Sequence, residues 1–183
     1  MSINNQKVVE MCKKQKRLLL LQSPHEESQW ISDGYTMYPL LGMPELTEEN
    51  IRAIYSLPEN VRVEVEILPP QYCYRDTFRD ERLVFYEKIQ LKPCGEAVIT
   101  LRTRNGVVFI HEKYLKPLEA GENGEPMLFE RTDDLGRTYI VAKQGIFLEA
   151  VIPPIRNLLK ADWLDDLQEL LSILRKTFEQ EEE

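Results

Sequence analysis

The stretch that most constrains the fold is residues 96–112, where two runs of alternating apolar and polar residues flank Asn105-Gly106. Asn-Gly is a preferred pair for a two-residue type I′ turn, because both central residues need a positive φ. The pattern therefore predicts a β-hairpin in which Arg104 lies opposite Val107. One face suits a core and carries Ile99, Leu101, Thr103, Val108 and Ile110. The other face is mixed and carries Thr100, Arg102, Arg104, Phe109 and His111. This mixed face either contacts a helix or stands open to a partner, which includes a second copy of the chain.

Periodicity predicts the other elements. Strict alternation over 61–67 predicts a strand with Val61, Val63, Val65 and Ile67 toward the core. The apolar run within 17–22 predicts a strand covered on both faces, in a three-stranded meander over 17–40. Further predicted strands are 83–91, 127–131, 137–143 and 146–152, and predicted helices are 3–16, 47–57 and an amphipathic helix over 162–179. We therefore expect one α+β domain over 1–183. Its twisted, mainly antiparallel sheet of hairpins and meanders is packed by the C-terminal helix and the shorter helices, and the acidic tail 179–183 is frayed.

Charge and hydropathy narrow the functional classes. The net charge is −8, the pI is near 5.0, and no apolar run approaches the ~20 residues that span a bilayer. The N-terminus lacks the order of a signal peptide, so we expect a cytoplasmic protein. An acidic surface repels phosphate backbones, which argues against direct nucleic-acid binding and favours a protein partner with a basic surface. Acidity of this size is also common for solubility alone.

Catalytic signatures are weak. Cys12, Cys73 and Cys94 are odd in number, widely spaced and outside any CxxC motif. His111 could activate Cys73 or Cys94, and a pocket collecting that histidine with a cysteine would favour an enzyme. His25 and His111 are isolated, which disfavours a metal site, and there is no P-loop. We assign no catalytic residue, cofactor or metal ligand and expect a non-enzymatic protein. The alternative is an enzyme or small-molecule-binding domain.

Residues 71–82 are the least regular stretch, combining three aromatic residues with charged ones. A loop of this length is often functional, and its composition is that of an interface hot spot. The alternative is that the aromatic side chains fold back onto the core. The candidate partner contacts are Tyr72, Tyr74, Arg75, Asp76, Phe78, Asp80 and Glu81, together with Asp133 and Asp134 of a predicted turn. The acidic loop 119–125 is a further candidate contact.

Several segments together carry a family resemblance. They are Arg17 to Leu20, Gln29 to Gly34, Tyr38-Pro39-Leu40, Pro44 to Asn50, Phe109 to Pro117 and Leu148 to Ile152. They resemble a family of small acidic proteins encoded by phages and mobile elements of gut bacteria, which includes a Cas9-inhibiting, type II anti-CRISPR protein. The resemblance covers most of the chain and assigns no site residue.

What the resemblance implies is inhibition of a CRISPR-Cas9 effector in the bacterial cytoplasm by stoichiometric binding. Cas9-type effectors hold guide and target in positively charged channels, which an acidic protein could occupy. A further alternative is a structural or assembly accessory of a mobile element.

Overall fold

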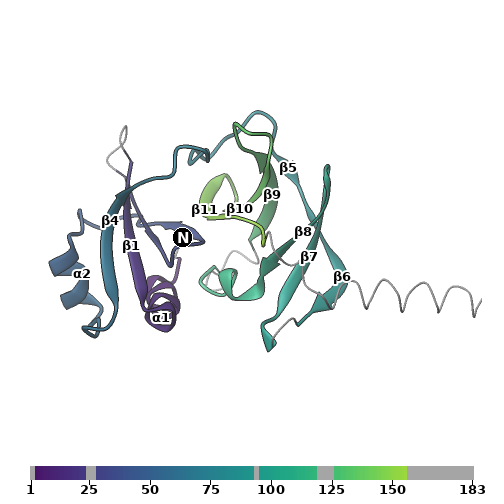
Figure 1. The fold of residues 1–183 in the computed structure, drawn as a ribbon. Helices are drawn as coiled ribbons and strands as arrows, with labels where there is room; N and C mark the ends of the chain where they lie inside the picture. The colour runs from purple at the N-terminus through teal and green to yellow at the C-terminus, as the bar shows by residue number, and fades with distance from the viewer. Residues whose placement is uncertain (1–2, 24–27, 93–94, 119–125, 156–183) are drawn as a thin grey trace, which may run out of the picture.

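The computed structural model describes residues 3–23, 28–92, 95–118 and 126–155. Within these ranges the chain is mixed α+β, with two α-helices and two β-sheets (Figure 1). The strands are β1 (Arg17–Gln22), β2 (Gln29–Ser32), β3 (Met37–Pro39), β4 (Arg62–Ile67), β5 (Arg82–Leu83), β6 (Phe85–Leu91), β7 (Val98–Thr103), β8 (Gly106–His111), β9 (Met127–Thr132), β10 (Thr138–Gln144) and β11 (Phe147–Ile152). The predicted fold class is therefore confirmed. The predicted helix 162–179, the tail 179–183 and the loop 119–125 lie outside the described residues.

The larger sheet has eight strands in the order β4-β1-β2-β3-β11-β10-β9-β5, and the smaller has the order β6-β7-β8. Neighbours are antiparallel except β1 and β4, which are parallel. The four leucines of β1 are buried, as the apolar run predicts, because β4 and β2 flank this strand and both sheet faces are covered. The meander over 17–40 is confirmed as β1-β2-β3.

Both short helices begin at side-chain caps. In α1 (Asn5–Gln15) the Asn4 side chain accepts a hydrogen bond from the Lys7 N–H, and in α2 (Glu48–Ile54) Thr47 and Asn50 form a capping box. The buried face of α1 carries Val8, Val9 and Cys12 against β1 and β2. In α2 only Ile51 is fully buried, and it joins the same core cluster.

The hairpin forms with a different turn from the predicted one. Thr103 pairs with Gly106 and Arg102 with Val107, so the two turn residues are Arg104 and Asn105. A type I′ turn needs positive φ at both central residues, whereas the one positive φ here is +116° at Gly106, which is the least costly place for it. The hairpin tip also docks on β9, since the Arg104 N–H donates to Glu130 Oε2 at 2.7 Å. The predicted pairing of Arg104 with Val107 is therefore wrong.

The innermost pair of the hairpin moves by one residue on each strand, so the partner of any given residue changes by two positions. Because side chains alternate with a period of two, the two faces of the hairpin keep their predicted character. Leu101, Thr103 and Ile110 are buried on the core face. On the mixed face Phe109 is only 8% exposed and packs against Ile155, whose N–H donates to the Phe109 carbonyl at 2.8 Å. Part of the mixed face is therefore closed, while Arg102 and Arg104 stay exposed.

The strand β4 departs from its predicted burial. Val61 and Val63 lie in the core, but Val65 is 49% exposed and Ile67 is 68% exposed. The expectation that all four face the core is wrong at the second half of the strand. Alternation shows which side chains share a face, but whether that face is covered depends on what packs there. In Figure 1 β4 is the outermost strand of the larger sheet.

Candidate functional site: a loop held by buried Arg131

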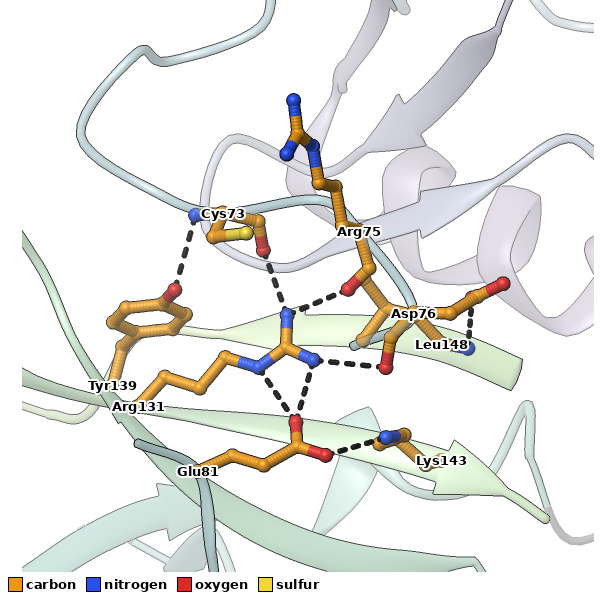
Figure 2. Close-up of polar contacts among 8 residues, drawn as sticks. All are labelled: Cys73, Arg75, Asp76, Glu81, Arg131, Tyr139, Lys143 and Leu148. Carbon is orange, nitrogen blue, oxygen red and sulfur yellow. Dashed lines mark hydrogen bonds and ion pairs between the residues drawn. The ribbon is translucent and has the colours of Figure 1, made fainter. Parts of the chain in front are cut away.

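The loop of residues 71–82, called the clamp loop below, is held against the larger sheet by one buried side chain (Figure 2). Arg131 lies on β9, and its side chain is 0% exposed. Its Nη1 donates to the carbonyls of Cys73 at 3.0 Å and Arg75 at 2.8 Å, and its Nη2 donates to the carbonyl of Asp76 at 3.2 Å. Nε and Nη2 also donate to Glu81 Oε2, at 3.0 and 2.6 Å. These five bonds match the five N–H donors of a guanidinium, so none of its hydrogen-bonding capacity is left unused.

The charges around Arg131 form a triad in which Arg131 and Lys143 are buried and Glu81 is half-buried. Glu81 accepts from Arg131 through Oε2 and from Lys143 Nζ through Oε1 at 2.6 Å, and the Lys143 side chain is 6% exposed. Burial alone would raise the pKa of Glu81, but the hydrogen bonds and charges of Lys143 and Arg131 prevail and lower it. Two cations share one carboxylate here. The excess positive charge is offset by the three carbonyls and by two aromatic faces, with Arg131 over Phe78 at 5.4 Å and Lys143 over Phe129 at 5.1 Å.

The aromatic side chains of the clamp loop fold back onto the larger sheet. Tyr72 stacks edge-to-face on Tyr139 with centroids 4.9 Å apart, and Tyr74 does so on Trp30 at 5.0 Å. Both are half-buried, and the Tyr74 hydroxyl donates to the Pro69 carbonyl at 3.1 Å. The Tyr139 hydroxyl in turn accepts the Cys73 N–H at 3.0 Å. Together with Phe78 under Arg131, these rings anchor the loop, while the exposed contact surface consists of other side chains.

The charged candidates divide into structural and exposed residues. Glu81 belongs to the triad, and Asp76 Oδ1 accepts the Leu148 N–H at 2.8 Å, which ties the loop to β11. Asp133 is buried and closes the β9–β10 turn, where Oδ1 accepts the N–H groups of Leu135 and Arg137. Backbone and side-chain bonds, above all from Arg137, lower the pKa of Asp133 against the opposing effect of burial. Arg75, Asp80 and Asp134 are exposed, so they are the predicted contacts that a partner can reach most directly.

The clamp loop as a whole is not acidic. It contains three arginines, Arg75, Arg79 and Arg82, against Asp76, Asp80 and Glu81. Within the described residues a more acidic segment is 44–68, which includes α2 and β4 and holds six carboxylates against two arginines, a net charge of −4. The candidates proposed from the sequence therefore do not gather into one acidic patch.

Sequence reasoning did not single out Arg131 and Lys143. Both lie within predicted strands, where a lone cation normally indicates a solvent-facing position. One signal was present: Arg131 and Lys143 lie on consecutive strands that the aromatic and charged stretch 71–82 could cover. No periodicity could show that the loop does cover them.

A cleft of about 720 Å³ lies between β1, the β2–β3 turn and the end of β8. His111, Lys113, Tyr114 and Glu96 line one wall, and Arg17, Tyr35 and Glu66 line another. His111 Nδ1 lies 3.1 Å from Glu96 Oε2, at ion-pair distance but without hydrogen-bond alignment. Burial and the charge of Lys113 lower the pKa of His111, and this effect is only partly offset by Glu96 and Asp33.

This cleft lacks the thiol that a nucleophilic mechanism with His111 would need. Neither Cys12 nor Cys73 lines it, and Cys94 lies outside the described residues. Cys12 is buried under α1, where its thiol donates to the Ser32 carbonyl and where burial and the nearby Asp33 raise its pKa far above the ordinary value. A thiol in that state is not an activated nucleophile. In the described part of the chain no three His, Cys, Asp or Glu side chains are placed to hold a metal ion.

Comparison with known proteins adds no identity: no protein-family model, curated protein or solved structure matches the chain. No helix within the described ranges is long and apolar enough to cross a membrane.

Proposed function

We propose that the protein acts by binding a protein partner stoichiometrically and carries out no chemistry of its own. The observation that supports this most is the clamp loop. An irregular segment of this length would normally be mobile, yet Arg131 fixes three of its carbonyls and the rings of Tyr72 and Tyr74 anchor it. The exposed side chains of the loop are thus presented from an ordered backbone, which reduces the entropy lost on binding.

The proposed partner is a protein with a basic surface, and a guide-loaded Cas9 effector is the first to test. The net charge of −8 favours encounter with a basic surface. The family resemblance supplies the Cas9 assignment, together with an origin in a phage or mobile element. In this account the protein occupies a positively charged channel or holds the effector in one conformation.

Charge reversal on two separate surfaces tests the electrostatic part of the proposal. One variant carries Asp80→Lys and Asp134→Lys beside the clamp loop, and the other carries Glu49→Lys and Glu59→Lys around α2. These four side chains are exposed, and none of them forms an ion pair with another residue that the structure describes. Affinity for guide-loaded Cas9 is measured by calorimetry at two salt concentrations, with a charge-neutral variant, Asn60→Gln, as the matched control.

The surface that contacts the partner should lose affinity on reversal, mainly through a slower association rate and a weaker salt dependence. Unchanged affinity in both reversed variants would reject an electrostatic contact. No binding by the unmodified protein to any of several Cas9 orthologues would reject the Cas9 assignment.

A further inference from the structure

The outer edge of β4 is an unpaired sheet edge. β4 ends the eight-stranded sheet, and β1 is the one strand that pairs with it in the described part of the chain. The N–H groups of Arg62 and Leu68 donate to the carbonyls of Lys16 and Gln22 on the β1 side. Because backbone groups alternate in direction along a strand, Val63, Val65 and Ile67 direct their N–H and C=O groups away from the sheet. A row of backbone donors and acceptors therefore faces outward.

Apolar side chains accompany this row. Ile51 of α2 lies in the core cluster with Val61 and Val63, but the cover ends there, and Val65 and Ile67 remain 49% and 68% exposed. Sheet edges that must stay unpaired usually carry a lysine, a proline, a bulge or an inward-pointing charge. β4 has no lysine, proline or bulge, although its polar face carries Arg62, Glu64 and Glu66, and it pairs with β1 in unbroken register. An edge with free backbone groups and exposed branched side chains is a template for another strand.

The polar face of β4 is balanced in charge once Arg17 of the neighbouring β1 is counted with it. Arg62 and Arg17 lie beside Glu64 and Glu66, with Arg62 at 2.7 Å and Arg17 at 3.0 Å from Glu64, and Arg17 at 3.3 Å from Glu66. Two positive and two negative charges leave no net charge to repel a strand of the same composition. This balance distinguishes the β4 edge from the net acidity of residues 44–68 as a whole.

We infer that β4 pairs antiparallel with β4 of a second copy of this chain, about a two-fold axis through Glu64. This register sets Val63 opposite Val65 of the second copy, and these are residues whose backbone groups both point outward, as a hydrogen-bonded pair requires. It also sets Arg62 opposite Glu66. Val61 lies opposite Ile67 without a backbone bond between them, because the Val61 N–H already donates to the Pro58 carbonyl and the Val61 carbonyl accepts from Arg52 Nη2. The second copy covers the exposed apolar side chains of β4, and two ion pairs between Arg62 and Glu66 form across the interface.

The neighbouring symmetric register is less favourable. An axis through Val65 would place Glu64 opposite Glu66 twice, and directly opposed like charges destabilise a strand pair. In the inferred register one like pair occurs, Glu64 with its own copy. Each of these carboxylates is already held by Arg17 and Arg62.

The test is the oligomeric state of the full chain, measured by light scattering and sedimentation over a concentration series. The inference predicts a species of twice the 21.5 kDa chain mass. Val65→Lys should shift it to the monomer, while Ile146→Lys, an equally apolar and 67% exposed site in the β10–β11 turn, should leave the dimer intact. Circular dichroism verifies that each variant is folded.

Charge exchange then tests the register. Arg62→Glu alone should weaken the dimer about tenfold or more, because two glutamates then face each other at both ends. Adding Glu66→Arg should restore it. A monomer at every concentration, a dimer that survives Val65→Lys, or a failure of the second change to restore association would each overturn the inference.

Discussion

Replacing Arg131 with methionine tests the role of the clamp most sharply. Methionine fills much of the same volume but removes the five donors, leaving the Glu81 carboxylate with Lys143 alone and the carbonyls of Cys73, Arg75 and Asp76 without a partner. Breaking a buried ion pair by removing one partner typically costs about 3–5 kcal/mol. Each carbonyl left dry would add about 1–3 kcal/mol. The loop can open to water, however, so its release limits the total to about 3–5 kcal/mol.

Urea unfolding followed by fluorescence measures this loss. With a slope of about 2 kcal/mol per molar urea, as for small proteins, the midpoint should fall by about 2 M. The matched control is Arg102→Met, because Arg102 pairs with Glu87 but its side chain is 74% exposed, so the expected cost is below about 1 kcal/mol.

Hydrogen exchange shows where the loss occurs. The Cys73 and Leu148 amides, which donate to Tyr139 and Asp76 respectively, should exchange fast in the Arg131→Met variant and slowly in the unmodified chain. An Arg131→Met midpoint no lower than that of Arg102→Met, with both amides still protected, would show that Arg131 does not hold the clamp loop.

Three further predictions concern the fold. The folded pKa values of Glu81 and Asp133 are lowered, so their contribution to stability is complete above the unfolded pKa values of about 4.3 and 3.9 and disappears as the pH falls through the folded pKa values. Glu81→Gln should therefore flatten the loss of thermal stability measured between pH 5 and pH 2 in steps of about one pH unit, and an unchanged loss would contradict this role. An added Cβ at Gly106 meets nothing within 4 Å, so Gly106→Ala should cost about 1–2 kcal/mol of folding free energy through backbone strain at φ +116° alone. A chemical-denaturation midpoint equal to that of the unmodified chain would exclude the observed turn. Iodoacetamide should label the half-buried Cys73 in the native protein and Cys12 only after unfolding, as peptide mass spectrometry can determine; native labelling of Cys12 would show that α1 does not bury it.

Local patterns were enough to predict most elements, because period and turn chemistry act within a few residues. The core face of the 96–112 hairpin, the doubly covered strand β1 and the meander over 17–40 follow from that level. The prediction of a type I′ turn was wrong because Asn-Gly also suits a turn with a single positive φ at the glycine. Glu130, which lies 26 residues after Arg104, stabilises the observed turn by accepting the Arg104 N–H.

The candidate site depended on contacts that the sequence does not encode locally. The composition of residues 71–82 identified the clamp loop, but it could not show in which direction the aromatic rings of the loop point. The residue that holds the loop, Arg131, lies 50 to 58 residues further along the chain. The same limit applies to β4. Its alternation gave the correct face for Val65 and Ile67, yet it could not show that this face stays 49% and 68% exposed at these two residues.

Stoichiometric binding can be tested by titrating the protein into a cleavage reaction of guide-loaded Cas9. The concentration of Cas9 is held well above the dissociation constant of the complex. Stoichiometric binding predicts a linear loss of cleavage that ends at a fixed small ratio of protein to effector and is unchanged by longer incubation. Complete cleavage in a large excess of the protein, with no complex on size exclusion, would contradict it.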